Sequence, residues 1–149
     1  MLIVPPPIFA IVYLLISAGL SYFLGWPAIP AENIALFIGG ACVLGGLILA
    51  PSAALLFMKE KTDLNPAARE NRTLVTSGPF RFTRNPMYLG VSIATLGAAL
   101  MVGSWPMLLA PLATFATANW VHIPAEEANM RRQFGDGFDA YARRVRRWL

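Results

Sequence analysis

Charged residues are scarce in this chain. Only 13% of its 149 residues are Asp, Glu, Lys or Arg, whereas 56% are hydrophobic. A soluble domain usually carries about 25% charged residues, so these few charges would not cover a water-exposed surface. Lipid removes that requirement because it solvates apolar side chains. The composition and length therefore predict one membrane-embedded domain spanning 1–149.

Other absences exclude whole classes of chemistry. With one cysteine, Cys42, and one histidine, His122, the chain has neither an internal disulfide nor a multi-ligand zinc site. We expect no metal. No G-x-G-x-x-G follows a strand pattern, and neither a P-loop nor a G-x-S-x-G elbow is present. The first seven residues lack Lys and Arg, so we do not expect a removable signal peptide.

Four apolar stretches predict an all-α integral membrane protein with four transmembrane helices. They cover about 8–24, 34–58, 87–102 and 105–121. A helix that crosses the hydrocarbon core needs about 20 residues. The first and fourth stretches are at the short end of the usual range and the third is slightly below it, so interfacial neighbours or a thin bilayer must make up the difference. A short loop that contains Trp26 connects the first stretch to the second, and one that contains Gly103 connects the third stretch to the fourth.

The basic residues form two blocks, one in the loop between the second and third stretches and one in the tail after the fourth. They are Lys59, Lys61, Arg69, Arg72, Arg81 and Arg84, then Arg131, Arg132, Arg143, Arg144, Arg146 and Arg147. Four spans place the loop, the tail and the N-terminus on one side, which the positive-inside rule makes cytoplasmic. The net charge of +4 therefore reflects membrane topology, and no nucleic-acid partner is expected. The membrane is a bacterial inner membrane or an organelle membrane.

The tail is predicted to form a C-terminal amphipathic helix over about 125–147. Its apolar residues recur three or four positions apart on one helical face. They are Met130, Phe134, Phe138, Tyr141, Val145 and Trp148. Gly135 and Gly137 weaken the helix in its middle. Two interpretations stay open, a helix lying on the membrane surface and a lid over the cytosolic loop.

Two polar clusters border the predicted spans. The first, LVTSGPFRFTRNPMYLG, occupies 74–90, where Gly78-Pro79 indicates a turn and Pro86 suits the first turn of a helix. Arg81 and Arg84 lie just before this helix. They are suited to binding a carboxylate or phosphate, or alternatively to anchoring the chain among lipid headgroups.

The second cluster is the pair Glu126 and Glu127, directly after the fourth span. Such carboxylates can hold a cation, hydrogen-bond a ribose or act as a base. Alternatively, they are first-turn acids that favour the start of the tail helix. His122, just before them, is either an interfacial polar residue or a contact to a cofactor or substrate.

With these motifs in this order, the chain resembles the isoprenylcysteine carboxyl methyltransferase and phospholipid N-methyltransferase superfamily. The resemblance covers 74–149, about half of the chain. The family's turn, its Arg-His/Asn-Pro-x-Tyr-x-Gly motif, its Glu-Glu pair and its closing Arg-Val all have counterparts. The matching residues are Thr76, Gly78, Pro79, Phe80, Arg84, Asn85, Pro86, Tyr88, Gly90, Glu126, Glu127, Phe134, Gly135, Tyr141, Arg144 and Val145.

This resemblance implies a membrane enzyme that uses S-adenosylmethionine, which enters from the cytosol, and a lipophilic or lipidated acceptor, which arrives from the bilayer. The residues implied to bind the cofactor are Val75, Gly78, Pro79, Phe80, Asn85, Pro86, Tyr88, Glu126 and Glu127. The residues implied to be catalytic are Arg84, Glu127 and Arg144, the arginines gripping an acceptor carboxylate or phosphate.

Two departures from the family pattern bear on the acceptor. Residue 85 is Asn where the prenylcysteine enzymes usually have His, and residue 146 is Arg where they tend to have Pro. A prenylcysteine-type carboxylate, a lipid amine and a thiol therefore stay open, as does the oligomeric state. The alternatives to a methyltransferase are a non-catalytic membrane scaffold or accessory protein and, further off, an NADPH-dependent enzyme resembling sterol reductases.

Overall fold

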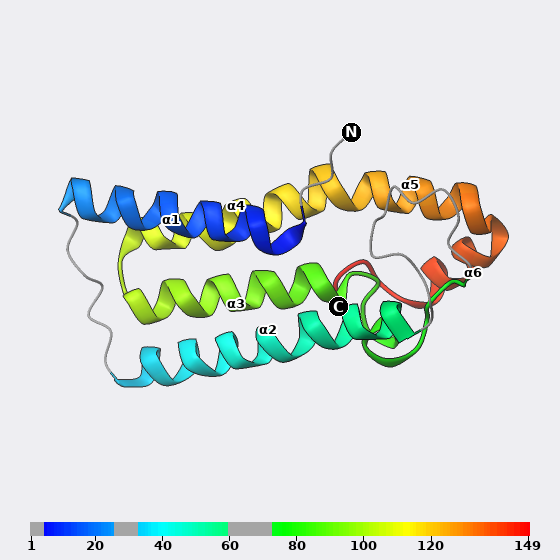
Figure 1. The fold of residues 1–149 in the computed structure, drawn as a ribbon, viewed down its shortest axis with the longest axis horizontal. Coiled ribbons are helices and arrows are strands. Elements are labelled where there is room, and N and C mark those ends of the chain that lie inside the picture. Colours follow the sequence, from blue (N-terminus) through cyan, green and yellow to red (C-terminus); the bar gives the residue numbers. More distant parts are fainter. Residues whose placement is uncertain (1–4, 26–32, 60–72) are drawn as a thin grey trace.

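The chain folds as a bundle of helices in the computed structural model, which describes residues 5–25, 33–59 and 73–149 (Figure 1). Within these ranges there is no strand, so the all-α prediction is confirmed. The helices are α1 (Pro6–Leu24), α2 (Asn33–Lys59), α3 (Pro86–Val102), α4 (Leu109–Thr117), α5 (Ile123–Phe134) and α6 (Asp136–Arg144). Two 3₁₀ turns, η1 (Gly78–Arg81) and η2 (Trp105–Leu108), and one π-helical turn, η3 (Ala118–His122), complete the described elements.

Two helices, α1 and α2, are long and apolar enough to cross a membrane, and α3 is a shorter apolar helix. The first three predicted stretches agree with α1, α2 and α3 to within two residues at each end. The fourth stretch becomes η2, α4 and η3 in succession and continues into α5, so no single long helix represents it. Trp26, Lys61, Arg69 and Arg72 lie outside the described residues.

Helices α2 and α3 make the most extensive helix contact, along two rows of small residues. A methyl group added at Gly46 would lie 2.3 Å from the carbonyl oxygen of Gly90, and one added at Gly97 would lie 2.4 Å from that of Gly39. Only hydrogen fits at such positions. In lipid, where no hydrophobic force drives helices together, this close backbone approach supplies the packing energy.

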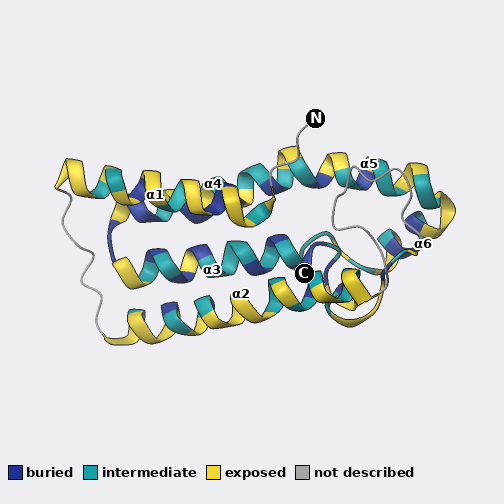
Figure 2. Cartoon of the chain, viewed as in Figure 1, coloured by how far each residue is buried: buried dark blue, intermediate teal, exposed yellow. Residues whose placement is uncertain are grey.

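Helix α1 packs against α4, η2 and α3. Two hydroxyl pairs join it to the chain after α3: Tyr13 Oη lies 2.9 Å from Thr117 Oγ1, and Ser21 Oγ lies 2.7 Å from Ser104 Oγ. The outer faces of α1 and α2 are exposed and apolar (Figure 2). A bilayer is the solvent that suits such faces.

The single helix predicted for 125–147 is wrong. Gly135 has φ of 50° and ψ of −124°, a backbone conformation that residues other than glycine rarely adopt. It separates α5 from α6. Helix α6 folds back, with Arg131 Nε donating to Asp139 Oδ1 at 3.0 Å, and the chain is extended at Val145. The apolar face of this region packs on Val75 and Phe80, which favours the lid interpretation.

Candidate functional site

The polar turn at 77–85 is held by the tail, which lies alongside it. The Tyr141 hydroxyl donates to the Phe80 carbonyl at 2.8 Å, and the Arg84 N–H donates to the Arg146 carbonyl at 3.0 Å. Burial raises the pKa of Tyr141 to about 12, so its hydroxyl keeps its proton at neutral pH. Residues more than sixty positions apart thereby form one unit.

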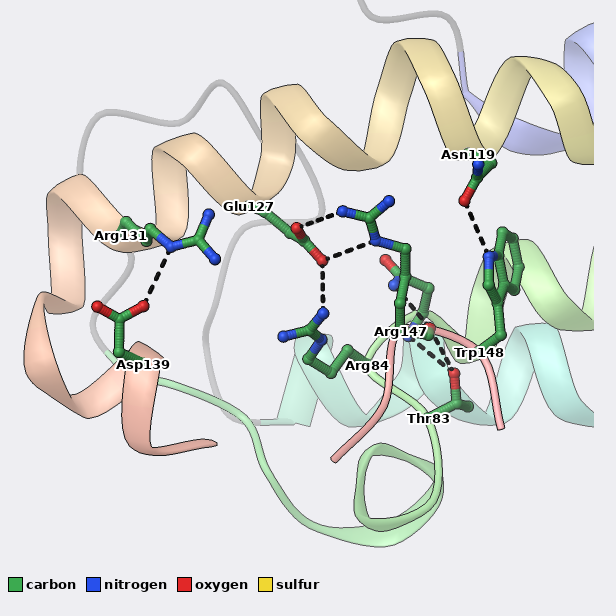
Figure 3. A network of polar contacts seen from close by, with 9 residues as sticks. Thr83, Arg84, Asn119, Glu127, Arg131, Asp139, Arg147 and Trp148 are labelled. Carbon is green, nitrogen blue, oxygen red and sulfur yellow. Dashed lines mark hydrogen bonds and ion pairs between the residues drawn. The ribbon is translucent and has the colours of Figure 1, made fainter. Parts of the chain in front are cut away.

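The carbonyl of Arg147 is a second joint between the turn and the tail. Thr83 Oγ1 donates to it at 3.0 Å and Asn85 Nδ2 donates to it at 2.9 Å (Figure 3). Both donors are buried, so their polar groups need such partners. The Asn85 amide thus acts here on the protein's own backbone.

Glu127 lies at the centre of an ion cluster (Figure 3). Its Oε1 is 2.9 Å from Arg84 Nη2 and 3.1 Å from Arg147 Nε, and its Oε2 is 2.8 Å from Arg147 Nη2. The hydrogen bonds to Glu127 raise the pKa of Arg147. Glu127 is only 7% exposed, so its charge is stable only because both arginines contact it. The predicted residues Arg84 and Glu127 therefore meet.

Glu126 faces a different partner, Tyr88, whose hydroxyl donates a hydrogen bond to its Oε1. Burial raises the pKa of Glu126 to about 7; the Tyr88 hydrogen bond lowers it, and the neighbouring charge of Glu127 raises it. Near neutral pH this carboxyl can therefore gain or lose a proton. The two adjacent glutamates thus lie in opposite settings, one neutralised by cations and one beside a phenol.

Three aromatic rings line the Tyr88 side of the site. The Phe9 ring lies 5.1 Å from that of His122, at an interplanar angle of 14°, and 6.5 Å from that of Tyr88, at 20°. Phe9 and Tyr88 are buried together with Ala118 and Ile123. His122 therefore points to the site and not only to the membrane interface.

Trp148 ties the tail to the π-helical turn η3. Its Nε1 donates to Asn119 Oδ1 at 3.0 Å (Figure 3), and its indole stacks on Phe115 with centroids 4.7 Å apart. A π-helical turn inside a helix is often found at a functional site. Here the same turn carries both Asn119 and His122.

Of the remaining predicted residues, five lie in or beside the turn and one, Arg144, lies away from Glu127. Pro86 starts α3 beside the ion cluster, and it is buried. Val75 and Phe80 are buried under α6, while Gly78 and Pro79 form the outer part of the turn. Arg144 is exposed at the end of α6. The structure does not bring it to Glu127; the bidentate contact comes from Arg147 instead.

Sequence reasoning missed five contributors: Phe9, Thr83, Asn119, Arg147 and Trp148. Phe9 stands in an apolar run where nothing distinguishes it from its neighbours. Arg147 belongs to the run RRVRRWL, in which the family's Arg-Val pattern pointed to Arg144 and not to Arg147. The only available signal was Trp148, which continues the apolar spacing of the tail.

Comparisons with known proteins place the sequence beside one family and one distant relative. The sequence model of the phospholipid methyltransferase family matches residues 34–137. Protein-S-isoprenylcysteine O-methyltransferase from Schizosaccharomyces pombe is 31% identical over 85 residues, which are 53% of this chain and 34% of that protein. The chain thus spans about a third of the length of the curated relative it matches. No solved structure matches.

Proposed function

Because this chain belongs to the phospholipid methyltransferase family, we propose that it transfers the methyl group of S-adenosylmethionine to a lipophilic acceptor at the cytosolic face of a membrane. The observation that carries the proposal is the meeting of Tyr88 with the Glu126–Glu127 pair. The two motifs are separated by the whole α3–α4 hairpin, yet Tyr88 donates directly to Glu126. Motifs of a shared site must converge in this way.

The residues at this point suit a sulfonium cofactor. A carboxylate attracts a nearby cation, and the faces of aromatic rings do the same. Glu126 offers the carboxylate, while Tyr88 and His122 offer rings whose centroids lie 6.0 Å apart. When bound, S-adenosylmethionine supplies an electrophilic methyl group.

Each protein group has a distinct task in this proposal. Glu126 and Tyr88 orient the cofactor, with the Tyr88 hydroxyl donating a hydrogen bond to the carboxyl of Glu126. Glu127 binds the cofactor as well and, through its cluster with Arg84 and Arg147, keeps the turn and the tail in one position, which supplies the register that methyl transfer needs. Asn85 and Pro86 fix the start of α3 next to this cluster. Arg84 Nε is buried and has no hydrogen-bond partner among residues 5–25, 33–59 and 73–149, which makes Arg84 the better candidate for binding an anionic acceptor. Arg144 is the other candidate.

The acceptor is proposed to be a prenylcysteine-type carboxylate or a lipid amine. Two observations support a lipophilic molecule: the family model concerns phospholipids, and the fission-yeast relative is named for isoprenylcysteine. The bundle's exposed apolar faces give such a molecule a route from the bilayer.

Four membrane-crossing segments are part of the proposal. All basic residues in the described ranges belong to the end of α2, to the turn at 78–84, or to α5, α6 and the residues after them. These elements lie at the same end of the bundle (Figure 1). The positive-inside rule puts that end in the cytosol. Asp136→Cys and Trp105→Cys, each made in a Cys42→Ser background, should react with a membrane-impermeant maleimide added on opposite sides of the membrane.

A binding titration in detergent tests the methyltransferase proposal. The unmodified protein should bind S-adenosylmethionine and its demethylated product, S-adenosylhomocysteine, and Glu126→Gln should weaken the first more than the second because only the first is cationic. Gln133→Ala, on the same helix, is the matched control. Labelled cofactor should also methylate a cell lipid extract or a farnesylated cysteine derivative. Absence of binding in every lipid condition would sink the proposal.

A further inference from the structure

The buried face of α1 ends at the candidate site. Phe9, Tyr13 and Ser17 are four residues apart and lie on one side of the helix. The first stacks on His122 and Tyr88, and the hydroxyl of the second pairs with Thr117 at 2.9 Å. Tyr13 lies one helical turn from Phe9, and its pair with Thr117 holds the start of α1 against the end of α4.

The opposite face of α1 is exposed and apolar. Ile8 is 51% exposed, Ile11 54% and Leu15 67%. Phe9 therefore separates the Tyr88–Glu126 pair from the side of the bundle that a bilayer would solvate. The charged groups next to this pair lie in the turn at 77–85 and in the tail, where Arg84 and Arg147 contact Glu127.

We infer that Phe9 forms the acceptor side of the site and sets how bulky a reacting group can be methylated. This inference rests on the proposed function. A polar cofactor arrives at the arginine-rich, water-facing end, so a lipophilic acceptor meets Glu126 from the side that Phe9 closes. Rings stacked 5.1 Å apart leave no room for a further group between them, so the acceptor occupies space at the edge of Phe9 or the space that its ring vacates.

Residue 9 lies outside the part of the chain that the family model matches. Helix α1 ends at Leu24, whereas the family match begins at residue 34. The wall is therefore contributed by a segment outside the matched region, and the acceptor side of the site can differ from that of relatives while the Glu pair stays the same.

The test compares Phe9→Ala and Phe9→Leu with Ile11→Ala, a matched change on the exposed face of the same helix. Each purified variant is first checked for S-adenosylhomocysteine binding. Methyl transfer from labelled cofactor is then measured with four probes, a compact and a bulkier one of each class: S-farnesylthiopropionic acid, N-acetyl-S-farnesylcysteine, phosphatidylethanolamine and its N-methyl derivative. The readout is the ratio of kcat/KM for the bulkier over the compact probe.

We expect Phe9→Ala to raise this ratio about fivefold or more, because space for a single methylene is worth about tenfold in an apolar pocket. Phe9→Leu should raise it less and Ile11→Ala not at all, with S-adenosylhomocysteine affinity within about twofold throughout. An unchanged ratio in both Phe9 variants would overturn the inference alone. Loss of S-adenosylhomocysteine affinity in both, with Ile11→Ala unaffected, would place Phe9 on the cofactor side and also overturn it.

The unmodified protein distinguishes the two levels of the proposal. If it binds neither S-adenosylmethionine nor its product, the methyltransferase function fails and the inference fails with it. If it binds the cofactor but methylates none of the four probes, the acceptor classes and the role of Phe9 are overturned while the cofactor site stands.

Discussion

Two regions of this molecule, the α2–α3 pair and the polar end of the bundle, are held together by opposite means. The α2–α3 pair is apolar and depends on the closeness of two backbones, with Gly46 against Gly90 and Gly97 against Gly39. The polar end, formed by 77–85 and 118–149, depends on ion pairs and hydrogen bonds such as those of Glu127 and Arg147. The first device needs only small residues at regular spacing, whereas the second needs particular groups brought together from distant segments.

This difference separates scaffold from chemistry. Close backbone packing tolerates no added volume but is indifferent to pH. A cluster of buried charges is sensitive to pH and to the loss of any member. Changes in the two regions should therefore have different signatures, which the following experiments measure from the largest expected effect to the smallest.

Removing the central charge should break the polar end. Glu127→Ala leaves Arg84 and Arg147 facing each other without their anion, and loss of one partner of a buried pair costs about 3–5 kcal/mol; we expect about 3 kcal/mol because Arg147 is partly exposed to solvent. Unfolding in detergent with increasing denaturant measures the loss. Asp139→Ala removes an exposed ion pair and should cost under about 1 kcal/mol. Equal effects would contradict the difference in burial.

Adding a methyl group between α2 and α3 should break the scaffold. The Gly46→Ala methyl would meet the Gly90 carbonyl oxygen at 2.3 Å, so we expect a loss of about 1–3 kcal/mol from overpacking. The neighbouring Gly45→Ala is the control, because its methyl meets nothing within 4 Å. That change should stabilise the helix by up to about 1 kcal/mol. Thermal unfolding of both variants over a range of pH should give the same difference at each pH.

We expect the stability of the folded protein to depend on pH through the polar end of the bundle. Because the folded pKa of Glu126 is raised from 4.5 to about 7, the folded state holds a proton that the unfolded state releases. This bound proton stabilises the folded state fully below about pH 4.5, and the stabilisation is lost as pH rises to about 7. After allowance for solvent, the free energy of unfolding should change by about 1–2 kcal/mol over this range. Glu126→Gln should flatten this part of the stability profile.

The same titration should appear in ligand binding. Deprotonated Glu126 favours the cationic cofactor, so the affinity for S-adenosylmethionine relative to S-adenosylhomocysteine should rise as pH increases through about 7. Isothermal titration at pH 6 and pH 8, values either side of that pKa, measures the ratio. A pH-independent ratio in the unmodified protein would argue against contact between Glu126 and the sulfonium.

The smallest expected effect concerns the link between the tail and η3. Trp148→Phe keeps the stacking on Phe115 but removes the N–H donated to Asn119. We expect a loss of about 1 kcal/mol, typical of one hydrogen bond. A double-mutant cycle with Asn119→Ala should show a coupling energy of about 0.5 kcal/mol or more. Additive losses would mean that the hydrogen bond does not join the two segments.

Much of this architecture could be read from local pattern. The apolar runs predicted α1, α2 and α3 to within two residues, because a helix that meets lipid must be apolar along its length. The order of the Arg-Asn-Pro-Met-Tyr motif and the Glu pair indicated which polar residues converge. The apolar spacing of the tail correctly indicated its packing face. It did not indicate the reversal at Gly135, because that reversal depends on the backbone conformation of one residue, and the same apolar spacing also fits a straight helix.

The sequence by itself determined the helical class, the apolar segments and the basic residues concentrated outside them, because these depend on composition and on periodicity along the chain. Only the tertiary structure decided which arginine of RRVRR meets Glu127, and that Phe9 of α1 reaches Tyr88. Similar local surroundings do not tell which arginine or which apolar side chain of a run contacts the site. Their roles follow from where the folded helices place them, since buried charges and rings act over a few ångströms of space and not along the chain.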